Sequence, residues 1–399
     1  LESHIEEKMG IKQLTKLIGD AAPEAIKEIK IEAYFGRKVA VDASMSIYAF
    51  LIAMQRPDGT NMLTNDAGEV TSHINGLMMR TTKMLEVGIK PVYVFDGKPP
   101  DLKKGTLDDR REKRQEADDA LAKAKEEGNA EDVEKFSKRT VRVSKEMTED
   151  AKTLLRLMGV PVIEAPTEAE AQCSALAKAG AVHAAVSEDM DTLTFGAPVM
   201  LRNIFVPESR KVPILEITLS KVLEGLDMDM AQFIDLCILM GCDYCGTIKG
   251  CGPKTAQDWI TKHKSINGVM KAIDTSKHPP PEPFNHEEIH QFFKEPEITP
   301  VSELQEKGLL TWKAPDFEGM RKFLVEDKQF SADRIENVIK RLQKTQGTNT
   351  QARLDSFFVK KDPPNGVKRP APPAKGKDAK KAKASGGKGA PGRPKGKGK

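Results

Sequence analysis

The feature that most constrains the fold is an alternation, along the first half of the chain, between short β-rich apolar runs and longer helical patterns. The apolar runs cover residues 39–41, 91–95, 159–163 and 182–186. Strands that are separated by helical segments form βαβ units, in which successive strands lie parallel in one sheet. The sequence therefore predicts an α/β fold with a mainly parallel central sheet that is flanked by helices.

Acidic residues occur where these apolar runs end. Some directly follow a strand, two open the helix after residues 165–166, and one follows the apolar run 236–240: Asp42, Asp96, Glu168, Glu170, Asp189, Asp191 and Asp243. Ligands of such sheets bind beyond the carboxyl ends of the strands, and carboxylates gathered there repel each other unless cations lie among them. Oxygen ligands without His or Cys favour Mg²⁺ or Mn²⁺ over zinc. The pattern predicts a divalent metal site, and paired metals there would suit phosphodiester hydrolysis.

Each of these acids also has a purely structural interpretation. A single Asp after a strand is commonly a helix cap or a turn residue. Residues 167–170 match a capping box, in which Thr167 caps the helix and Glu170 bonds back to the backbone. Because acids recur after successive strands, we favour a functional role for the group as a whole.

A glycine-rich turn at residues 248–256 predicts contact with the backbone of a nucleic acid. We expect a helix, a tight turn with Gly250 and Gly252, and a second helix that Pro253 opens. Glycines let backbone amides approach a phosphate closely, and the N-terminus of the following helix favours an anion. The alternative is an ordinary turn with Pro at the first helical position.

Two longer stretches are expected to be helical. Residues 103–152 are rich in Glu, Lys, Arg and Ala and almost free of β-formers, which is typical of a solvated helical hairpin or coiled coil. Residues 216–345 are expected to be mostly helical, apart from the proline-rich loop 278–284.

Two further metal-binding patterns are weaker. Three cysteines lie between residues 242 and 251, but a structural zinc site needs four ligands and only His263 is near in sequence. Residues 286–290 match the H-E-x-x-H pattern of metalloproteases, yet we expect them on a short, polar, exposed helix without a third ligand. A metalloprotease is a rival interpretation that a third ligand buried beside this helix would support.

Charge is distributed unevenly along the 399-residue chain. The formal net charge is +4, but residues 360–399 carry 14 Lys or Arg against two Asp or Glu, a net +12 that leaves −8 for residues 1–359. The Pro-, Gly- and Lys-rich tail buries too little apolar surface to fold, and it suits nuclear import or loose attraction to phosphates. The alternative is a solubilising tail without a fixed partner. Five cysteines do not make a disulfide framework, and no apolar stretch is long enough to span a membrane.

Five long motifs point to one family: residues 35–48, 90–100, 165–171, 188–196 and 241–245. They resemble the eukaryotic flap endonuclease family of XPG-type 5′ nucleases, and the similarity extends from residue 9 to about residue 358. The resemblance implies a PIN-like 5′ nuclease fold with a helical arch, a helix-hairpin-helix-type element and a disordered basic tail. It also implies a structure-specific 5′ flap endonuclease with 5′–3′ exonuclease activity, which serves Okazaki-fragment maturation and long-patch base-excision repair by two-metal catalysis.

Related proteins are the nearest alternatives. The excision-repair nuclease has a very long spacer between its two nuclease regions, whereas Asp96 and Glu168 are only 72 residues apart. A relative that degrades 5′ ends as an exonuclease is harder to exclude by spacing. A non-catalytic, clamp-tethered scaffold that binds DNA junctions is expected to have lost some of the seven acids, and all seven are present.

The resemblance also implies roles for individual residues. Two Mg²⁺ ions, which Mn²⁺ can replace, would be held by two sets of acids: Asp42, Asp96, Glu168 and Glu170 for one ion, and Asp189, Asp191 and Asp243 for the other. Lys103 and Arg110 would be catalytic cations that contact the scissile phosphate. Tyr48 would stack on a base near the cut, with a core tyrosine as the alternative. DNA contacts are further implied for Arg80, Glu168, Gly241, Asp243, Lys249, Gly250, Gly252 and Lys254.

Residues 351–358 have the pattern Q-x-x-L-x-x-F-F, which resembles the box that binds sliding clamps. Gln351 would supply an amide, while Leu354, Phe357 and Phe358 would form an apolar plug for a pocket of proliferating cell nuclear antigen. The alternative is that this segment packs on its own core. The resemblance also implies a monomer that binds branched DNA with a 5′ flap, binds no membrane, and resides in the nucleus with nucleolar, nucleoplasmic and mitochondrial pools.

These patterns divide the chain into overlapping regions. They are an extension (1–8) before a natural start at Met9, an N-terminal nuclease region (9–113), a helical gateway or arch (103–150), an internal nuclease region with the glycine hairpin (131–263), a C-terminal helical part of the core (264–345), the clamp motif (351–359) and the basic tail (360–399). The resemblance places Gly10 near the active site. It shows one departure in the arch, where Lys113 stands at a position that is usually Arg.

Overall fold

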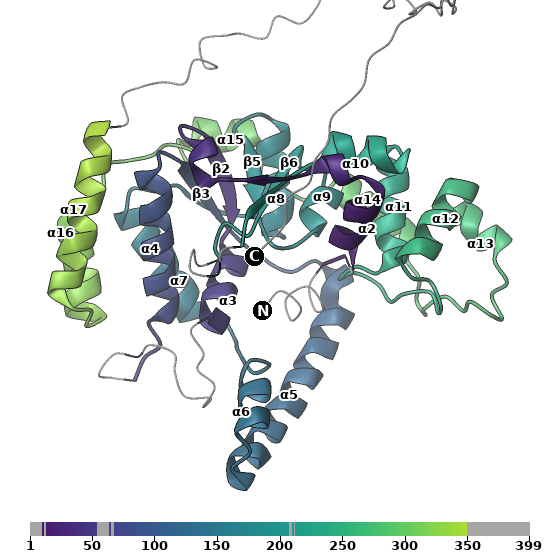
Figure 1. Cartoon of the computed structure of the whole chain (residues 1–399), viewed down its shortest axis with the longest axis horizontal. Helices are drawn as coiled ribbons and strands as arrows, with labels where there is room; N and C mark the ends of the chain where they lie inside the picture. Colours follow the sequence, from purple (N-terminus) through teal and green to yellow (C-terminus); the bar gives the residue numbers. More distant parts are fainter. Residues whose placement is uncertain are drawn as a thin grey trace, which may run out of the picture. The chain divides into compact units, whose positions relative to one another are not determined.

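Figure 1 shows the protein as a computed structural model, in which a seven-stranded sheet forms the centre. The structure describes residues 10–11, 13–53, 64, 68–206, 210 and 212–348. The strand order is β1-β7-β6-β5-β2-β3-β4, with the bounds β1 Ile26–Ile29, β2 Lys38–Asp42, β3 Lys90–Phe95, β4 Val162–Glu164, β5 Ala184–Val186, β6 Val199–Arg202 and β7 Ile214–Thr218. The predictions for residues 1–8 and for the clamp motif and tail lie outside the described residues.

The sheet is mixed, and its parallel part contains all four strands that the sequence predicts. β6, β5, β2, β3 and β4 pair in parallel, whereas β7 pairs antiparallel with β6 and with β1. β5 is shorter than the run 182–186 that contains it, and β4 overlaps the run 159–163 only at residues 162 and 163. The sequence patterns do not predict β1, β6 and β7, and β7 extends into the region that was expected to be helical from residue 216.

Alternate residues of β2 fill two different cores. Val39 and Val41 pack on one face of the sheet with four helices: α3 Ala43–Ala53, α4 Ser72–Glu86, α7 Lys145–Leu157 and α17 Ala332–Thr348. Ala40 packs on the opposite face against α8 (Ala169–Lys178). Successive side chains of a strand point to opposite faces. Because both faces are covered, the central strands read as continuous apolar runs.

The remaining helices surround this centre. They are α2 Leu14–Ala21, α5 Lys104–Glu127, α6 Ala130–Ser137, α9 Asp191–Thr194, α10 Leu219–Leu226, α11 Met230–Met240, α12 Pro253–His263, α13 Ile266–Ala272, α14 His286–Lys294, α15 Val301–Glu306 and α16 Phe317–Arg321, with short 3-10 segments at Pro23–Ala25, Ile31–Tyr34 and Asp101–Lys103 and a π-helical segment at Lys322–Asp327. Within the described residues, no helix is both long enough and apolar enough to cross a membrane.

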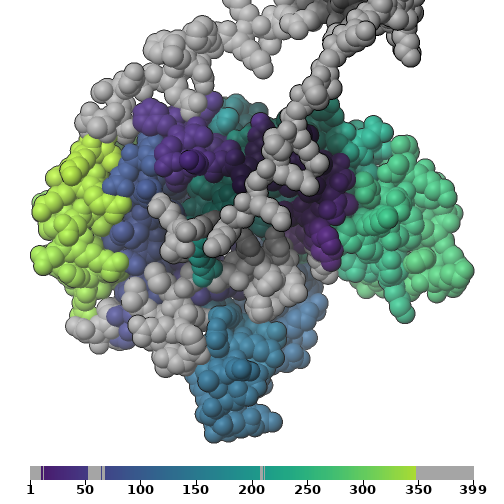
Figure 2. Space-filling model, in the orientation of Figure 1, coloured from purple at the N-terminus to yellow at the C-terminus, as the bar shows by residue number. Residues whose placement is uncertain are grey.

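Helices α5 and α6 form a charged hairpin that lies apart from the sheet in Figure 1 and protrudes from the surface in Figure 2, where it is blue. Gly128 ends α5 with a left-handed φ of 69°, and the Asn129 side chain accepts a hydrogen bond from the Asp132 N–H at 3.3 Å. These are ordinary helix-end signals. The predicted helical hairpin is confirmed. It is shorter than the expected arch of residues 103–150, because α7 begins at residue 145 and belongs to the core.

Candidate active site

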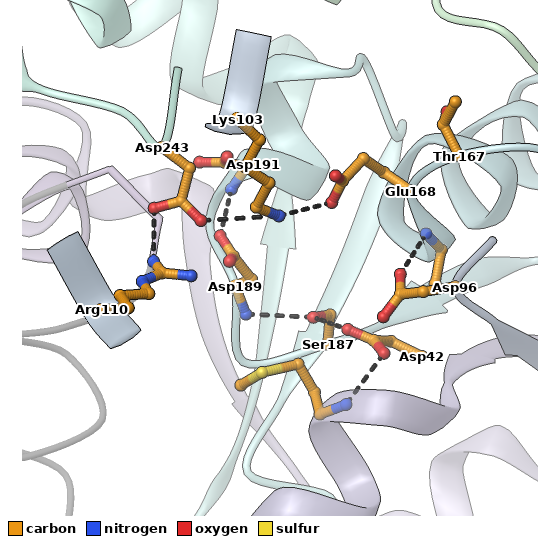
Figure 3. A network of polar contacts seen from close by, with 12 residues as sticks. Asp42, Asp96, Lys103, Arg110, Thr167, Glu168, Ser187, Asp189, Asp191 and Asp243 are labelled. Atoms are coloured by element: carbon orange, nitrogen blue, oxygen red, sulfur yellow. Dashed lines mark hydrogen bonds and ion pairs between the residues drawn. The ribbon is translucent and has the colours of Figure 1, made fainter. Parts of the chain in front are cut away.

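The ends of three parallel strands bring acids to one edge of the sheet (Figure 3). Asp42 is the last residue of β2, Asp96 directly follows β3, and Asp189 lies three residues after β5. Val41 of β2 pairs with β3 on one side and with β5 on the other, so the three strands end at similar levels. The register therefore gathers acids that are far apart in the sequence, as the alternation of strands and helices predicts.

The other acids reach this edge from helices and turns. Glu168 and Glu170 lie at the start of α8, and Asp243 lies in the turn after α11. Carboxylate oxygens of Asp96, Glu168 and Glu170 all lie within 4.8 Å of one another. Asp96 is exposed, whereas the other six acids expose between 1% and 8% of their surface. Close, buried carboxylates disfavour each other's charged form. Cations bound among them would offset this repulsion.

Asp42 is held by the first turn of α3, which follows it, and by the turn after β5. The Met45 N–H donates to Asp42 Oδ1 at 3.0 Å, and the Ser187 hydroxyl donates to Asp42 Oδ2 at 2.9 Å. Burial and the nearby Asp96 carboxylate nevertheless raise the pKa of Asp42 to about 8. The sequence interpretation missed Ser187, although its place between a predicted strand and Asp189 was a usable signal. Its oxygen also accepts the Asp189 N–H at 3.0 Å, so one hydroxyl orients two acids.

The start of α8 does not form the capping box that residues 167–170 suggest. The Thr167 hydroxyl donates to the Glu297 carbonyl at 3.2 Å, and Glu168 at the N-cap position makes no capping hydrogen bond. Instead, Asp96 Oδ1 accepts the Ala169 N–H at 2.8 Å. Because the carboxylate of Asp96, which directly follows β3, accepts this hydrogen bond at the N-terminus of α8, Glu168 and Glu170 are both available to the acidic cluster.

Asp189 and Asp191 form a short turn after β5. The Asp191 N–H donates to Asp189 Oδ1 at 2.9 Å. Burial and the Asp243 carboxylate raise the pKa of Asp189 to about 6, and burial followed by Asp189 raises the pKa of Asp191 well above its usual value. A Cβ on Gly10 would lie 2.0 Å from Asp189 Oδ1, and Gly10 has a φ of +66°. Only glycine fits there, so Gly10 lies beside the acids as the resemblance implies.

Two cations at the start of α5 bind these acids. Lys103 Nζ lies 2.7 Å from Glu168 Oε2 and 3.6 Å from Asp243 Oδ2, and the Arg110 guanidinium donates to Asp243 Oδ1 at 2.6 Å. Burial alone would lower the pKa of Lys103, but Glu168, Glu170 and Asp243 raise it above its ordinary value. The structure thus brings both predicted catalytic cations to the acidic cluster.

Two buried oxygens of the cluster lack a hydrogen-bond partner in the described part of the chain: Glu170 Oε2 and Asp191 Oδ1. A buried carboxylate oxygen without a partner is costly. Mg²⁺ and Mn²⁺ prefer such oxygen donors, and the cluster contains no His or Cys. The residues of the site therefore fit divalent cations of this class.

Two other predicted DNA-binding residues lie on α3 and α4. Burial raises the pKa of the Tyr48 hydroxyl, while Arg110 and Arg114 act to lower it, which places Tyr48 near the start of α5. Its ring also packs against the core, as the alternative interpretation expects. Arg80 donates to the carbonyls of residues 205–206 at 3.0 and 2.7 Å. These bonds hold Arg80 against the segment after β6, and its contact with DNA stays a prediction.

The glycine-rich turn differs from the expected helix, turn and helix. α11 ends at Met240, and Gly241, which follows it, has a φ of 103°. Residues 241–252 form turns and loops, so the expectation of a helix immediately before Gly250 is wrong. Glycine with positive φ is a common helix stop. Gly250 has a φ of +77°, and Pro253 opens α12 as predicted.

The two weaker metal patterns form no site within the described ranges, because neither contributes to a group of three acids, histidines or cysteines whose ligand atoms lie within 4.8 Å of one another. His290 Nδ1 instead lies 2.7 Å from Asp235 Oδ1. Cys242 Sγ lies 3.8 Å from Cys245 Sγ. α14 is also less exposed than expected, because it buries two of its apolar side chains in the core. The geometry therefore gives no support to a metalloprotease.

Comparisons with known protein sequences agree with this geometry. Residues 9–117 match the XPG N-terminal domain, and residues 159–243 match the XPG I-region. The chain is 55% identical over 351 residues to flap endonuclease 1 of Chlamydomonas reinhardtii, which covers 88% of each protein. It is 54% identical over 379 residues to flap endonuclease 1 of Nematostella vectensis, which covers 95% of this chain and 98% of the relative.

Solved structures show the same relationship. Flap endonuclease-1 from Methanococcus jannaschii matches with a TM-score of 0.64 and 36% identity, over 84% of this chain and 99% of that one. The catalytic core of Rad2 in complex with a DNA substrate matches with a TM-score of 0.62 and 25% identity, over 82% of this chain and 98% of that one. The extent and identity of these matches show that the chain belongs to the flap endonuclease family.

Proposed function

We propose that this chain is a Mg²⁺-dependent nuclease that cuts DNA near the junction between a 5′ single-stranded flap and a duplex, and that it also acts as a 5′–3′ exonuclease. Membership of the flap endonuclease family supports the substrate class. The observation that carries the proposal is the meeting of the acidic cluster with Lys103 and Arg110 at one edge of the sheet (Figure 3).

The acidic cluster is proposed to hold two Mg²⁺ ions, one on Asp42, Asp96, Glu168 and Glu170 and the other on Asp189, Asp191 and Asp243. When bound, paired divalent ions supply stabilisation of the attacking and leaving oxygens of a phosphodiester. Support comes from the buried carboxylate oxygens without partners and from the raised pKa values of Asp42 and Asp189. Both observations describe a site whose negative charge is not balanced by the protein.

Lys103 and Arg110 are proposed to act on the scissile phosphate. Their charged groups contact Glu168 and Asp243, so they lie where a phosphate that approaches the acids would meet them. A fixed cation at that place stabilises the negative charge that develops in the transition state. The carboxylates hold the two cations in position before substrate arrives.

Other residues are proposed to position the DNA. Tyr48 would stack on a base near the cut, Arg80 would contact the DNA, and the α5–α6 hairpin would admit the 5′ single strand. The glycine-rich turn would hold the backbone of the duplex through Gly241, Lys249, Gly250, Gly252 and Lys254. Support for this contact comes from the positive φ of Gly250 and from the N-terminus of α12 beside it.

Cleavage of a double-flap DNA labelled at its 5′ end tests the proposed activity. We expect a product cut near the flap junction in Mg²⁺, little cleavage of single strand or blunt duplex, and none in EDTA. Zinc should not replace Mg²⁺. Equal cleavage of the flap and the single strand, or cleavage that persists in EDTA, would contradict the proposal.

The proposal extends to a protein partner and a compartment. Residues 351–358 are proposed to bind the sliding clamp, and the basic tail is proposed to direct the chain to the nucleus; both lie outside the described residues, so the sequence alone supports them. Replacing Phe357 and Phe358 together by Ala should remove stimulation by added clamp and leave clamp-independent cleavage unchanged. Equal stimulation of both proteins in a clamp titration would reject this partner.

A further inference from the structure

We infer that Tyr244 is a positioning residue for catalysis, because its ring holds the ammonium group of Lys103 in place beside the acidic cluster. The inference rests on the proposed function, in which Lys103 acts on the scissile phosphate. Tyr244 directly follows Asp243 in the turn after α11, and the sequence patterns assign it no role.

The two side chains lie within the range of a cation–π contact and are largely shielded from water. Lys103 Nζ lies over the face of the Tyr244 ring, 5.9 Å from its centroid. The Lys103 side chain is 15% exposed, and Tyr244 is 6% exposed. A cation over an aromatic face is attracted by the negative charge of the ring face, and the attraction grows when water is excluded. The ring therefore favours one position of a long and otherwise flexible side chain.

Within the described part of the chain, the ion pairs of Lys103 are with the carboxylates of Glu168 and Asp243. Those two carboxylates are proposed to hold metal, and bound metal would compete with Lys103 for their oxygens. The Tyr244 ring carries no formal charge, so its attraction for Lys103 persists when the carboxylates are occupied. Of these three contacts, the ring is the one that is independent of metal binding.

Tyr244 is itself held in place by other aromatic rings. Its ring meets Phe292 at 5.0 Å and 63°, and Phe293 at 5.2 Å and 78°, both in edge-to-face geometry. Phe195 contacts the same two phenylalanines at 5.7 and 5.0 Å. Such pairs prefer defined angles and stabilise one ring orientation. We call Phe195, Tyr244, Phe292 and Phe293 the aromatic cluster, and through it α14 supports the active site.

A double-mutant cycle tests whether Tyr244 acts through Lys103. Single-turnover cleavage of flap DNA is measured for the full chain, Tyr244→Leu, Lys103→Ala and the double variant. We expect Tyr244→Leu to slow cleavage roughly tenfold without weakening DNA binding, and Lys103→Ala to slow it about a hundredfold or more. The double variant should be no slower than Lys103→Ala, because the ring then has no ammonium group to hold.

Two further variants separate this role from packing. Tyr244→Phe keeps the ring face and should cleave at the rate of the full chain. Leu342→Ala removes a buried core side chain of α17, a helix that contributes none of the residues placed in the site. It should lower thermal stability as Tyr244→Leu does, yet leave the cleavage rate near that of the full chain. If Tyr244→Leu does not fold, Phe292→Leu replaces it, with a smaller loss of rate that is again absent when Lys103 is Ala.

The outcomes distinguish the inference from the proposed function. If Tyr244→Leu slows the Lys103→Ala variant as much as it slows the full chain, or if Tyr244→Phe is as slow as Tyr244→Leu, Tyr244 does not act through Lys103 and the inference is wrong. A slow Lys103→Ala variant beside a fast Tyr244→Leu variant also overturns the inference alone. Full activity of Lys103→Ala overturns the proposed role of Lys103 and the inference with it.

Discussion

The acidic edge of the sheet and the α5–α6 hairpin build the site in different ways. At the edge, six of the seven acids are buried, and the register of three parallel strands fixes where Asp42, Asp96 and Asp189 lie. The hairpin is charged and largely exposed, and the buried side chains of α5 are those of Ala117 and Ala124. It reaches the acids through Lys103 and Arg110.

Because of this difference, the acids at the sheet edge are fixed, whereas the hairpin can move. The acids cannot leave the edge without disrupting the central strands, whereas a hairpin with few buried contacts opens locally at low cost. The sheet therefore fixes where the acids lie, while the start of the hairpin brings Lys103 and Arg110 into contact with them. A change at the edge should abolish the chemistry, and a change in the hairpin should slow it.

The largest expected effect follows removal of a carboxylate from the edge. Asp189→Ala should lower single-turnover cleavage by at least roughly a thousandfold and leave flap-DNA binding largely intact, because the acid is proposed to bind metal and makes no remote DNA contact in that proposal. Asp119→Ala removes an exposed acid from the hairpin and is the matched control, with a rate near that of the full chain. Near-normal turnover of Asp189→Ala at saturating Mg²⁺ would contradict the proposed role of Asp189 as a metal ligand.

Removal of a hairpin cation should have the next largest effect. Lys103→Ala or Arg110→Ala should slow single-turnover cleavage about a hundredfold to a thousandfold, with a much smaller change in affinity, since a cation that acts on the transition state affects the chemical step. Lys104→Ala is the neighbouring control, because its side chain is 71% exposed and pairs with Asp101. A variant of Lys103 or Arg110 that loses only affinity would mark that residue as a positioning contact.

Bound metal should stabilise the folded protein by an amount that depends on pH. The dependence should come from the acids at the edge of the sheet and not from the cations of the hairpin. The pKa values of Asp42 and Asp189 are raised to about 8 and about 6, so the folded protein binds these protons more tightly than the unfolded chain. The contribution of these two acids to metal-free stability is therefore fully present below about pH 4, falls as the pH rises through both values, and is lost above about pH 8. Lys103, whose pKa is raised, stays charged throughout and adds no slope.

Thermal unfolding with and without saturating Mg²⁺ measures this effect. We expect Mg²⁺ to raise the Tm at pH 8 by several degrees more than at pH 5, because bound cations offset the repulsion of ionised acids. Asp189→Asn should reduce the difference between the two pH values, and Asp119→Asn should not. An equal increase in Tm at both pH values would contradict the raised pKa values.

The smallest expected effect concerns local opening. Backbone amides of α5 should exchange hydrogen faster than those of β2, because the helix buries few side chains and the strand lies at the centre of the sheet. Bound flap DNA should slow exchange in α5 and leave β2 unchanged. Equal protection of both elements in the free protein would remove the basis of the comparison.

The sequence predicts the acidic edge better than the rest of the sheet. β2, β3 and β5 are recognisable because almost all of their residues are buried, and the acids that end or follow them combine a residue type with a position at the strand end. β1 has the sequence Ile-Lys-Glu-Ile, exposes its two charged residues, and lies at the end of the sheet. A pattern of this kind resembles a loop or a helical turn, so β1 is identified by its pairing with β7 rather than by composition.

Local sequence patterns give a wrong prediction where a residue distant in the sequence makes the hydrogen bond that the pattern assigns to a neighbour. Residues 167–170 match a capping box, but the Ala169 N–H bonds Asp96, which is 73 residues away in sequence. Tyr244 likewise looks like an ordinary turn residue, and its contacts with Lys103 and Phe292 depend on three separate segments meeting. Such roles are set by tertiary structure, and a single sequence carries no local signal for them.

The number of divalent ions held at the acidic edge tests the central claim most directly. Electron paramagnetic resonance of Mn²⁺ titrated into the chain, with cut product DNA present, counts bound ions independently of activity. Two ions per chain are expected for the full protein and for the hairpin control Asp119→Asn, and one fewer for Asp189→Asn. A full chain that binds no Mn²⁺, or an Asp189→Asn variant that binds as much as the full chain, would contradict the account.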